Sequence, residues 1–197
     1  ILIDQAEVKK LQQDFTHAEK LSTLSDQSST AIKIWRSNPD SFECQSVREE
    51  YGNEQLNSFL WAFNLPEFQT FSKKFVLNSG EFSHYLTEDS VFRFISIPRN
   101  PPVAILWHAL GYDKASILPG IMGNLLISTE QLPQARNAVL QAYEGKNIKN
   151  LCARAMRFAG SEISEEDAHE IILHLPDIFQ QALNKQKGIL TFACSEL

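Results

Sequence analysis

Apolar residues recur at helical spacing along much of the chain. Near its start, Val8, Leu11, Phe15 and Ala18 follow one another at steps of three or four residues. Such a stripe predicts a helix, and Asp4 stands where its N-cap would lie. The polar stretch SDQSST at 25–30 predicts a loop.

Two further helices are predicted on either side of Pro66, where apolar side chains return to helical spacing within residues 54–75. The segment VFRFISI at 91–97 is compatible with a strand or a short helix, because its periodicity does not decide between them.

The second half of the chain has a clearer pattern. A buried helix is expected at 102–111, and a strand at 124–128. Helices are expected after the capping residues Thr129 and Ser164, with another that Gly160 ends. The β-rich segment ILTFACS at 189–195 predicts a terminal strand, paired with 124–128 or with 91–97. The pattern therefore predicts an α+β fold, mostly helical, with a small sheet that includes the C-terminal strand.

Length and composition suit one domain over residues 1–197, since 43% of the 197 residues are hydrophobic. Eighteen Lys and Arg against 24 Asp and Glu give a net charge of −6. This negative charge disfavours binding to nucleic acid or to membrane surfaces and favours binding to a basic protein. Three cysteines without a C-x-x-C pair, no leader and no long apolar span favour a cytoplasmic protein.

The stretch AILWHALGYDKASILPGIMGNLLIS contains the candidates for ligand chemistry. Trp107, His108 and Tyr112 could line a pocket in which the imidazole acts on a small ligand. A histidine within an apolar helix is more often a hydrogen-bonded core residue, and this interpretation is preferred. Gly120 and Gly123 lack the G-K-[ST] continuation of a phosphate loop and favour a tight turn or a close approach of two elements.

Metal and thiol chemistry find little support in the sequence. His169 and His174 are five residues apart, whereas two ligands from one helix need a spacing of four. Cys152 falls on a predicted buried stripe, where its pKa would be raised. The sequence therefore predicts no metal, no cofactor and no catalytic residue.

Charged residues form two groups of opposite sign. The acidic segment 40–54 is the predicted contact surface for a protein partner; only Arg48 opposes its carboxylates. Its acidic residues are Asp40, Glu43, Glu49, Glu50 and Glu54. A run of basic residues lies directly before the acidic start of the next helix. We therefore predict that the opposite charges of these adjacent helices compensate one another, and nucleic-acid binding by the basic run is a weaker alternative. Its members are Lys146, Lys149, Arg154 and Arg157.

The order of motifs in the C-terminal half resembles the YfbM-like bacterial family of uncharacterised function. The resemblance lies in ILWHALG at 105–111, ILPGIMG at 117–123, LLISTEQL at 125–132 and the final helix leading into KGILTFA at 187–193. It covers residues 101–197; residues 1–100, expected to be helical, have no counterpart. The sequence departs from the family where Gly111-Tyr112-Asp113 ends the first helix, which puts any shared ligand site in doubt.

Some relatives in this family belong to toxin–immunity neighbourhoods, so the resemblance implies toxin neutralisation. The sequence thus predicts a non-enzymatic bacterial binding protein of the immunity type, covering a basic toxin domain. The alternative is an enzyme or small-ligand-binding protein with a pocket near Trp107 and His108.

Overall fold

The computed structural model describes residues 1–43, 54–77, 95, 97 and 100–192. Most of this part is helical, and a small antiparallel sheet completes a mostly helical α+β fold. The longer helices are α1 (Gln5–Leu21), α2 (Asp26–Ser37), α4 (Glu54–Trp61), α5 (Pro66–Leu77), α7 (Pro102–Leu110), α9 (Leu132–Tyr143), α10 (Ile148–Ala159) and α11 (Glu165–Lys185). Shorter turns are η1 (Pro39–Phe42), α8 (Tyr112–Ala115) and η2 (Gly160–Glu162).

The sheet consists of β1 (Leu2–Ile3), β2 (Leu125–Ile127) and β3 (Gly188–Thr191), in the order β1-β3-β2. Ile189 of β3 lies opposite Leu2 on one side and Ile127 on the other. The predicted pairing of the terminal strand with 124–128 is confirmed, whereas most of 91–97 lies outside the described residues. β1 was not predicted, because two residues are too few to show a period.

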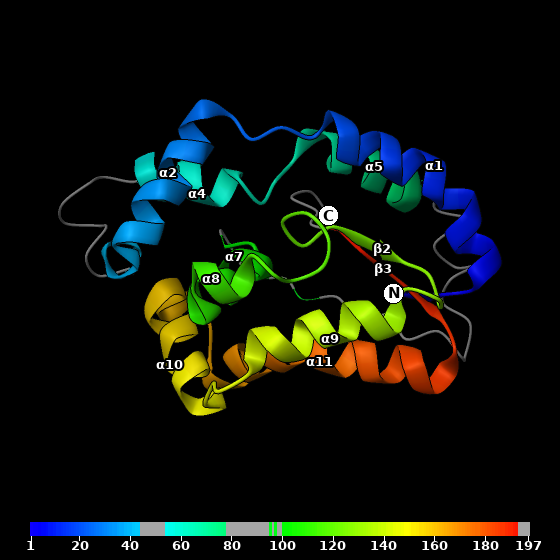
Figure 1. Cartoon of the computed structure of the whole chain (residues 1–197). Coiled ribbons are helices and arrows are strands. Elements are labelled where there is room, and N and C mark those ends of the chain that lie inside the picture. Colours follow the sequence, from blue (N-terminus) through cyan, green and yellow to red (C-terminus); the bar gives the residue numbers. More distant parts are fainter. Residues whose placement is uncertain (44–53, 78–94, 96, 98–99, 193–197) are drawn as a thin grey trace.

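Helices cover both faces of this sheet, as Figure 1 shows, with α1 and α5 on one side and α9 and α11 on the other. Side chains alternate accordingly along β2, because successive residues of a strand point to opposite faces. Leu126 packs with Phe15 and Phe68 of α1 and α5. Leu125 and Ile127 join the cluster that α9 and α11 form. The sheet is therefore buried on both faces.

A separate hydrophobic cluster surrounds α7, next to the sheet. Every residue of α7 from Ala104 to Leu110 is buried, and α2, α4, α10 and the first half of α11 supply its neighbours. The predicted buried helix at 102–111 is thus confirmed, and it forms the middle of a core. Within the described part of the chain, no helix is both long and apolar enough to span a bilayer.

Two predictions about helix starts are wrong. Residues 25–30 are not a loop: α2 begins at Asp26, and the Ser25 side chain accepts the backbone N–H of Ser28 as an N-cap. Polar residues are common in a capped first turn, so polarity alone was misleading. Thr129 does not cap the next helix, which begins at Leu132. The backbone N–H and the hydroxyl of Thr129 instead donate hydrogen bonds to the side-chain oxygen of Gln5.

The start of α11 is as predicted, since Ser164 forms a capping box with Asp167. The helix also continues through Pro176, which lacks the N–H that would bond the carbonyl of Ile172 four residues earlier. The hydroxyl of Tyr143 on α9 donates to that carbonyl at 2.6 Å. Burial raises the pKa of this hydroxyl. A side chain from α9 thus satisfies the acceptor that Pro176 leaves open.

Candidate functional site

His108 lies at the centre of the α7 cluster and is 0% exposed. Its ring stacks on Phe158 of α10, with the ring centres 4.6 Å apart. Its Nδ1 accepts a hydrogen bond of 3.1 Å from the indole N–H of Trp35 on α2. The imidazole therefore joins three helices that are distant in sequence.

The indole partner fixes the protonation state of this histidine. An indole nitrogen can only donate, so Nδ1 must offer a lone pair and the ring proton must sit on Nε2. Burial, followed by the charges of Arg154 and Arg157, lowers the pKa of His108 to about 3. His108 is thus a neutral imidazole whose Nε2–H faces away from Trp35.

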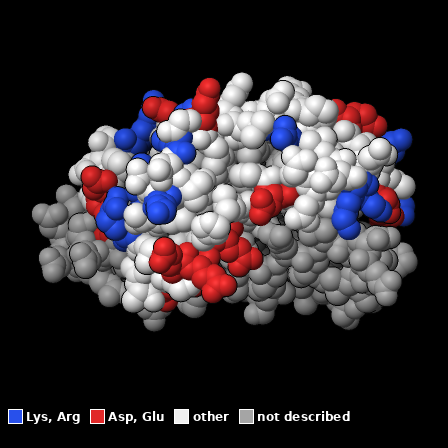
Figure 2. Space-filling model, turned by 90° about the horizontal axis from the view of Figure 1, so that it is seen from below, with Lys and Arg blue, Asp and Glu red and all other residues white. Residues whose placement is uncertain are grey.

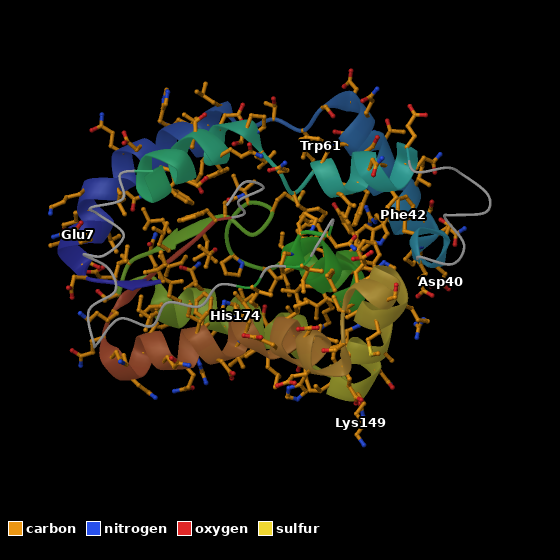
Figure 3. The ribbon with its side chains drawn as sticks, turned by 180° about the vertical axis from the view of Figure 1, so that it is seen from behind. Glu7, Asp40, Phe42, Trp61, Lys149 and His174 are labelled. Atoms are coloured by element: carbon orange, nitrogen blue, oxygen red, sulfur yellow. The ribbon has the colours of Figure 1, made fainter. Side chains whose placement is uncertain are left out.

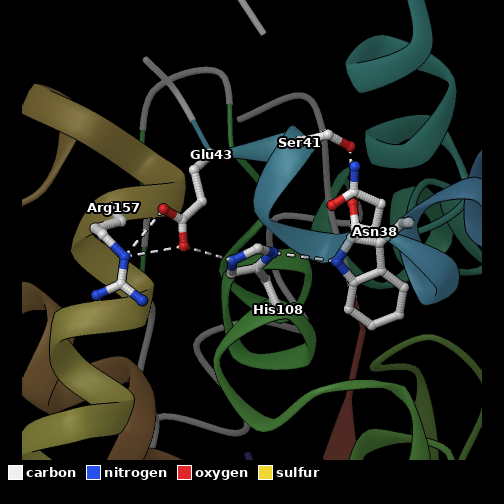
Figure 4. A network of polar contacts seen from close by, with 6 residues as sticks. Asn38, Ser41, Glu43, His108 and Arg157 are labelled. Atoms are coloured by element: carbon white, nitrogen blue, oxygen red, sulfur yellow. Dashed lines mark hydrogen bonds and ion pairs between the residues drawn. The ribbon is translucent and has the colours of Figure 1, made fainter. Parts of the chain in front are cut away.

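That Nε2–H faces the carboxylate of Glu43, which directly follows η1 (Figure 4). The closest distance, from Nε2 to Oε1, is 3.6 Å, longer than an ordinary hydrogen bond. Arg157 of α10 donates its Nε–H to both carboxylate oxygens at 2.9 Å. The Glu43 side chain is 17% exposed and that of Arg157 is 53% exposed. A series of contacts between polar groups thus extends from the buried indole of Trp35 through His108 and Glu43 to the exposed side chain of Arg157.

This arrangement is suited to holding elements together rather than to reacting. Catalysis by an imidazole needs a substrate within hydrogen-bond reach, whereas His108 is 0% exposed. Phe158 stacks on its ring, the indole of Trp35 occupies Nδ1, and the carboxylate of Glu43 lies 3.6 Å from Nε2. The nearby thiol of Cys152 is buried, and burial followed by the charge of Glu165 raises its pKa, as predicted from its apolar stripe. Such a thiol is poorly nucleophilic at neutral pH.

The predicted pocket residues are indeed neighbours, through ring contacts around Trp35. The ring centres of Trp107 and Tyr112 lie 6.4 Å and 6.3 Å from that of Trp35. Trp107 is only 8% exposed. The guanidinium of Arg36 covers the Tyr112 ring at 4.3 Å, a cation–π contact on the solvent side. These aromatic side chains therefore pack against one another and form part of the core.

The predicted acidic contact residues divide into three groups. Asp40 on η1 and Glu54 at the start of α4 are exposed. Glu43 is turned inward toward His108 and Arg157. Glu49 and Glu50, together with Arg48, lie outside the described residues. The inward position of Glu43 could not be recognised from sequence, because its two partners are far away along the chain.

The glycine pair forms a turn, as the sequence favoured. Ile121 and Asn124 exchange both backbone hydrogen bonds, and Met122 and Gly123 between them have φ of 49° and 88°. Two central residues with positive φ define a type I′ turn. A Cβ on Gly120 would lie 2.3 Å from the carbonyl oxygen of Asn124, and one on Gly123 would lie 2.7 Å from Val103. Both glycines therefore serve close packing.

Members of the predicted basic run lie along α10 and just before it. On the face shown in Figure 2, positive and negative side chains form small adjoining groups rather than one patch of a single sign. Arg157 is engaged with Glu43, and Lys149 is exposed (Figure 3). The predicted compensation between this run and the acidic start of α11 stays a prediction.

Two tryptophans were not identified from sequence as candidate functional residues. Trp35 is 0% exposed and carries the only donor to Nδ1 of His108 among the described residues. Trp61, at the end of α4, is 63% exposed. Its position seven residues after Glu54 placed both on one helix face, which was the available signal.

Comparison with known proteins gives no relative. No family model matches the chain, and neither a curated protein nor a solved structure matches it. The YfbM-like resemblance therefore stays a prediction.

Proposed function

We propose that this protein binds a basic protein partner through the outer face of α4. Three exposed residues, Glu54, Asn57 and Trp61, follow one another at steps of three and four. This spacing places them in one stripe over two helical turns. We call them the α4 stripe. The opposite side of α4 is anchored in the core by Phe59, which is 0% exposed.

The observation that carries the proposal is the exposure of Trp61, 63% of the residue. Figure 3 places this indole on the outer side of the helix, away from α7. Tryptophan is enriched among the few residues that dominate binding energy, because it buries a large rigid surface and offers an N–H donor. A solvated indole on a rigid, core-anchored helix is thus a suitable anchor for a partner.

Charge defines the partner's chemistry. Glu54 lies on the same stripe and Asp40 is exposed on η1, while the whole chain carries a charge of −6. Complementary charge around an apolar anchor speeds association and excludes partners of the same sign. A basic toxin domain, which the YfbM-like resemblance implies, fits this description, and the protein would then act as its immunity protein.

The proposal is tested by a photocrosslinking amino acid placed at position 61 of the full chain, in cells of the organism that encodes it. The matched control carries the same group at Leu140, an apolar residue of α9 that is 46% exposed. We expect one protein to be crosslinked from position 61 and not from position 140. Equal capture of the same proteins from both positions would show only nonspecific crosslinking and would contradict the proposal.

Once the captured partner has been purified, its affinity for the full chain and for single variants measures how much each residue contributes to binding. Trp61→Ala should weaken binding by roughly 30-fold or more, as expected of a central aromatic anchor. Glu54→Lys should weaken it mainly through slower association at low salt. Leu140→Ala should leave affinity unchanged. Affinity that is indifferent to both salt and Trp61→Ala would exclude the α4 stripe as the contact surface.

A further inference from the structure

A chain of polar contacts joins α2 and η1, which pack against α4, to α7 and α10. It runs from Trp35 on α2 through His108 on α7 to Glu43 after η1 and Arg157 on α10. We call these four residues the clasp. α2 and η1 pack with α4 through Trp35, Phe42 and Phe59, whose rings touch. The clasp therefore connects the α2–η1–α4 layer to α7 and α10.

The contact of the clasp between Trp35 and His108 holds only while His108 is neutral, for a geometric reason. The indole N–H of Trp35 points at Nδ1 from 3.1 Å. Protonation would put a second hydrogen on the same line, so that two donors face each other with no acceptor between them. A buried donor without an acceptor is costly. The added proton thus replaces an attractive contact between α2 and α7 with a repulsive one.

The charged groups around His108 come from a small number of elements. α10 contributes Arg154 and Arg157, which oppose a positive imidazole, and Glu43 after η1 faces Nε2. α2 contributes only the uncharged indole. Asp113 of α8 is 89% exposed and pairs with Arg36. The residues of α11 in this cluster are apolar: Ala168, Ile171 and Ile172. Among the residues that the structure describes, a positive charge at His108 thus meets two arginines and one carboxylate.

We propose that the clasp is an acid-sensitive fastening: one proton taken up by Nδ1 of His108 releases the α2–η1–α4 layer from α7 and α10. The release is local, because the sheet and its two pairs of helices form separate clusters that contain no part of the clasp. If the α4 stripe is the partner surface, its presentation becomes acid-sensitive; that consequence depends on the proposed function, whereas the release itself does not.

Native-state hydrogen exchange of the full chain, followed across the acid range without any partner, tests the release. The reporters are the backbone N–H groups of Asn38 at the end of α2 and Glu43 after η1, both internally hydrogen-bonded. After correction for intrinsic rates, their protection should fall about tenfold for each pH unit below about pH 6, the slope of one proton. Amides of the β2–β3 ladder exchange through global unfolding and share this slope, so the local release is recognised by a smaller free energy of opening at Asn38 and Glu43 than in the ladder at every pH. Equal free energies of opening at both places would mean that the layer opens only when the whole chain unfolds, and would overturn the proposal.

Two variants assign the proton. In His108→Asn, a side-chain carbonyl can still accept from Trp35 but does not titrate, so the pH slope at Asn38 and Glu43 should disappear. In Glu43→Gln, protection should be lower at neutral pH while the slope persists, because His108 still titrates. A slope lost in Glu43→Gln, or retained in His108→Asn, would assign the proton elsewhere and overturn the proposal.

The tautomer provides a measurement that needs no substitution. Nitrogen-15 spectra of the histidine rings should show Nε2 protonated and Nδ1 bare in His108 at neutral pH. A proton on Nδ1 would contradict the direction of the Trp35 hydrogen bond and remove the basis of the clasp. Failure of the α4 stripe to bind a partner would leave all of these results unchanged, so the two proposals fail separately.

Discussion

Two buried hydrogen bonds tie distant helices together, and they respond to pH in opposite ways. One joins Trp35 to His108 at 3.1 Å, and the other joins Tyr143 to the carbonyl of Ile172 at 2.6 Å. In the first, the titratable group is the acceptor, and acid removes its lone pair. In the second, the titratable group is the donor, and base removes its hydrogen. Contacts of similar geometry therefore protect the fold at opposite ends of the pH scale.

Their origins in the sequence also differ. The contact of Tyr143 has a local cause, because Pro176 cannot donate to Ile172 and leaves a buried carbonyl to be satisfied. The contact of His108 has no such cause, since both partners belong to elements far apart along the chain. The effect of proline within one helix can therefore indicate the Tyr143 contact, whereas only the packing of α2 against α7 reveals the His108 contact.

The largest expected effect is the loss of stability in acid. The pKa of His108 is about 3 in the folded chain, against an ordinary value of 6.5 that the unfolded chain retains. Between these values the unfolded chain binds the extra proton, so the stabilisation is complete above pH 6.5 and is lost as the pH falls toward 3. The free energy of unfolding should fall by about 1.4 kcal/mol per pH unit, several kcal/mol in all.

Urea denaturation at a series of pH values measures this slope, and His108→Asn is the comparison. The variant should be less stable at neutral pH but should depend less steeply on pH, so that the two curves converge in acid. Parallel curves would show that other groups, and not His108, determine the acid sensitivity of the fold.

Trp35→Phe should have the next largest effect. It leaves the buried Nδ1 of His108 without a donor and removes part of a ring that is 0% exposed. Together these losses should cost about 2–3 kcal/mol at neutral pH. Trp61→Phe, on the exposed indole, should change stability by less than about 0.5 kcal/mol. Comparable losses in both variants would contradict a special role for the buried indole.

The contrast between these two tryptophans also shows how far sequence alone could go. Helical stripes predicted α1, α4, α5, α7, α10 and α11, and the cap at Ser164 fixed the start of α11, because these features depend on neighbours within one or two turns. The capped start of α2 was missed, since Ser25 and the polar residues after it suit a loop as well as a first turn. The inward turn of Glu43 depends on tertiary contacts with His108 and Arg157, and no local pattern encodes such contacts.

A smaller effect is expected from Tyr143→Phe, which leaves the Ile172 carbonyl unsatisfied. The loss should be about 1–2 kcal/mol at neutral pH. In a Pro176→Ala background, the new N–H at position 176 can bond that carbonyl, so Tyr143→Phe should cost about 1 kcal/mol less. The four stabilities form a double-mutant cycle; additive losses would mean that Pro176 and Tyr143 are not coupled.

The same contact predicts a loss of stability in base. Burial raises the pKa of Tyr143 above its ordinary value of 10.0. The folded chain then keeps a proton that the unfolded chain releases, so this stabilisation is present below pH 10 and is lost as the pH rises above it. Tyr143→Phe should therefore weaken the alkaline dependence and leave the acid dependence of His108 unchanged.

The smallest effect provides a reference that pH should not alter. Gln186 ends α11 in the left-handed region, with φ of 53° and ψ of 43°, and its side chain is exposed. Glycine adopts this conformation without strain, so Gln186→Gly should raise the free energy of unfolding by up to about 1 kcal/mol. Gln186→Ala keeps the strained backbone and should stay within a few tenths of a kcal/mol of the parent chain. Because no titratable group is involved, the gain in Gln186→Gly should be equal in acid and in base. A gain that varied with pH would mean that the end of α11 is coupled to His108 or Tyr143, and the two contacts could then no longer be treated as independent.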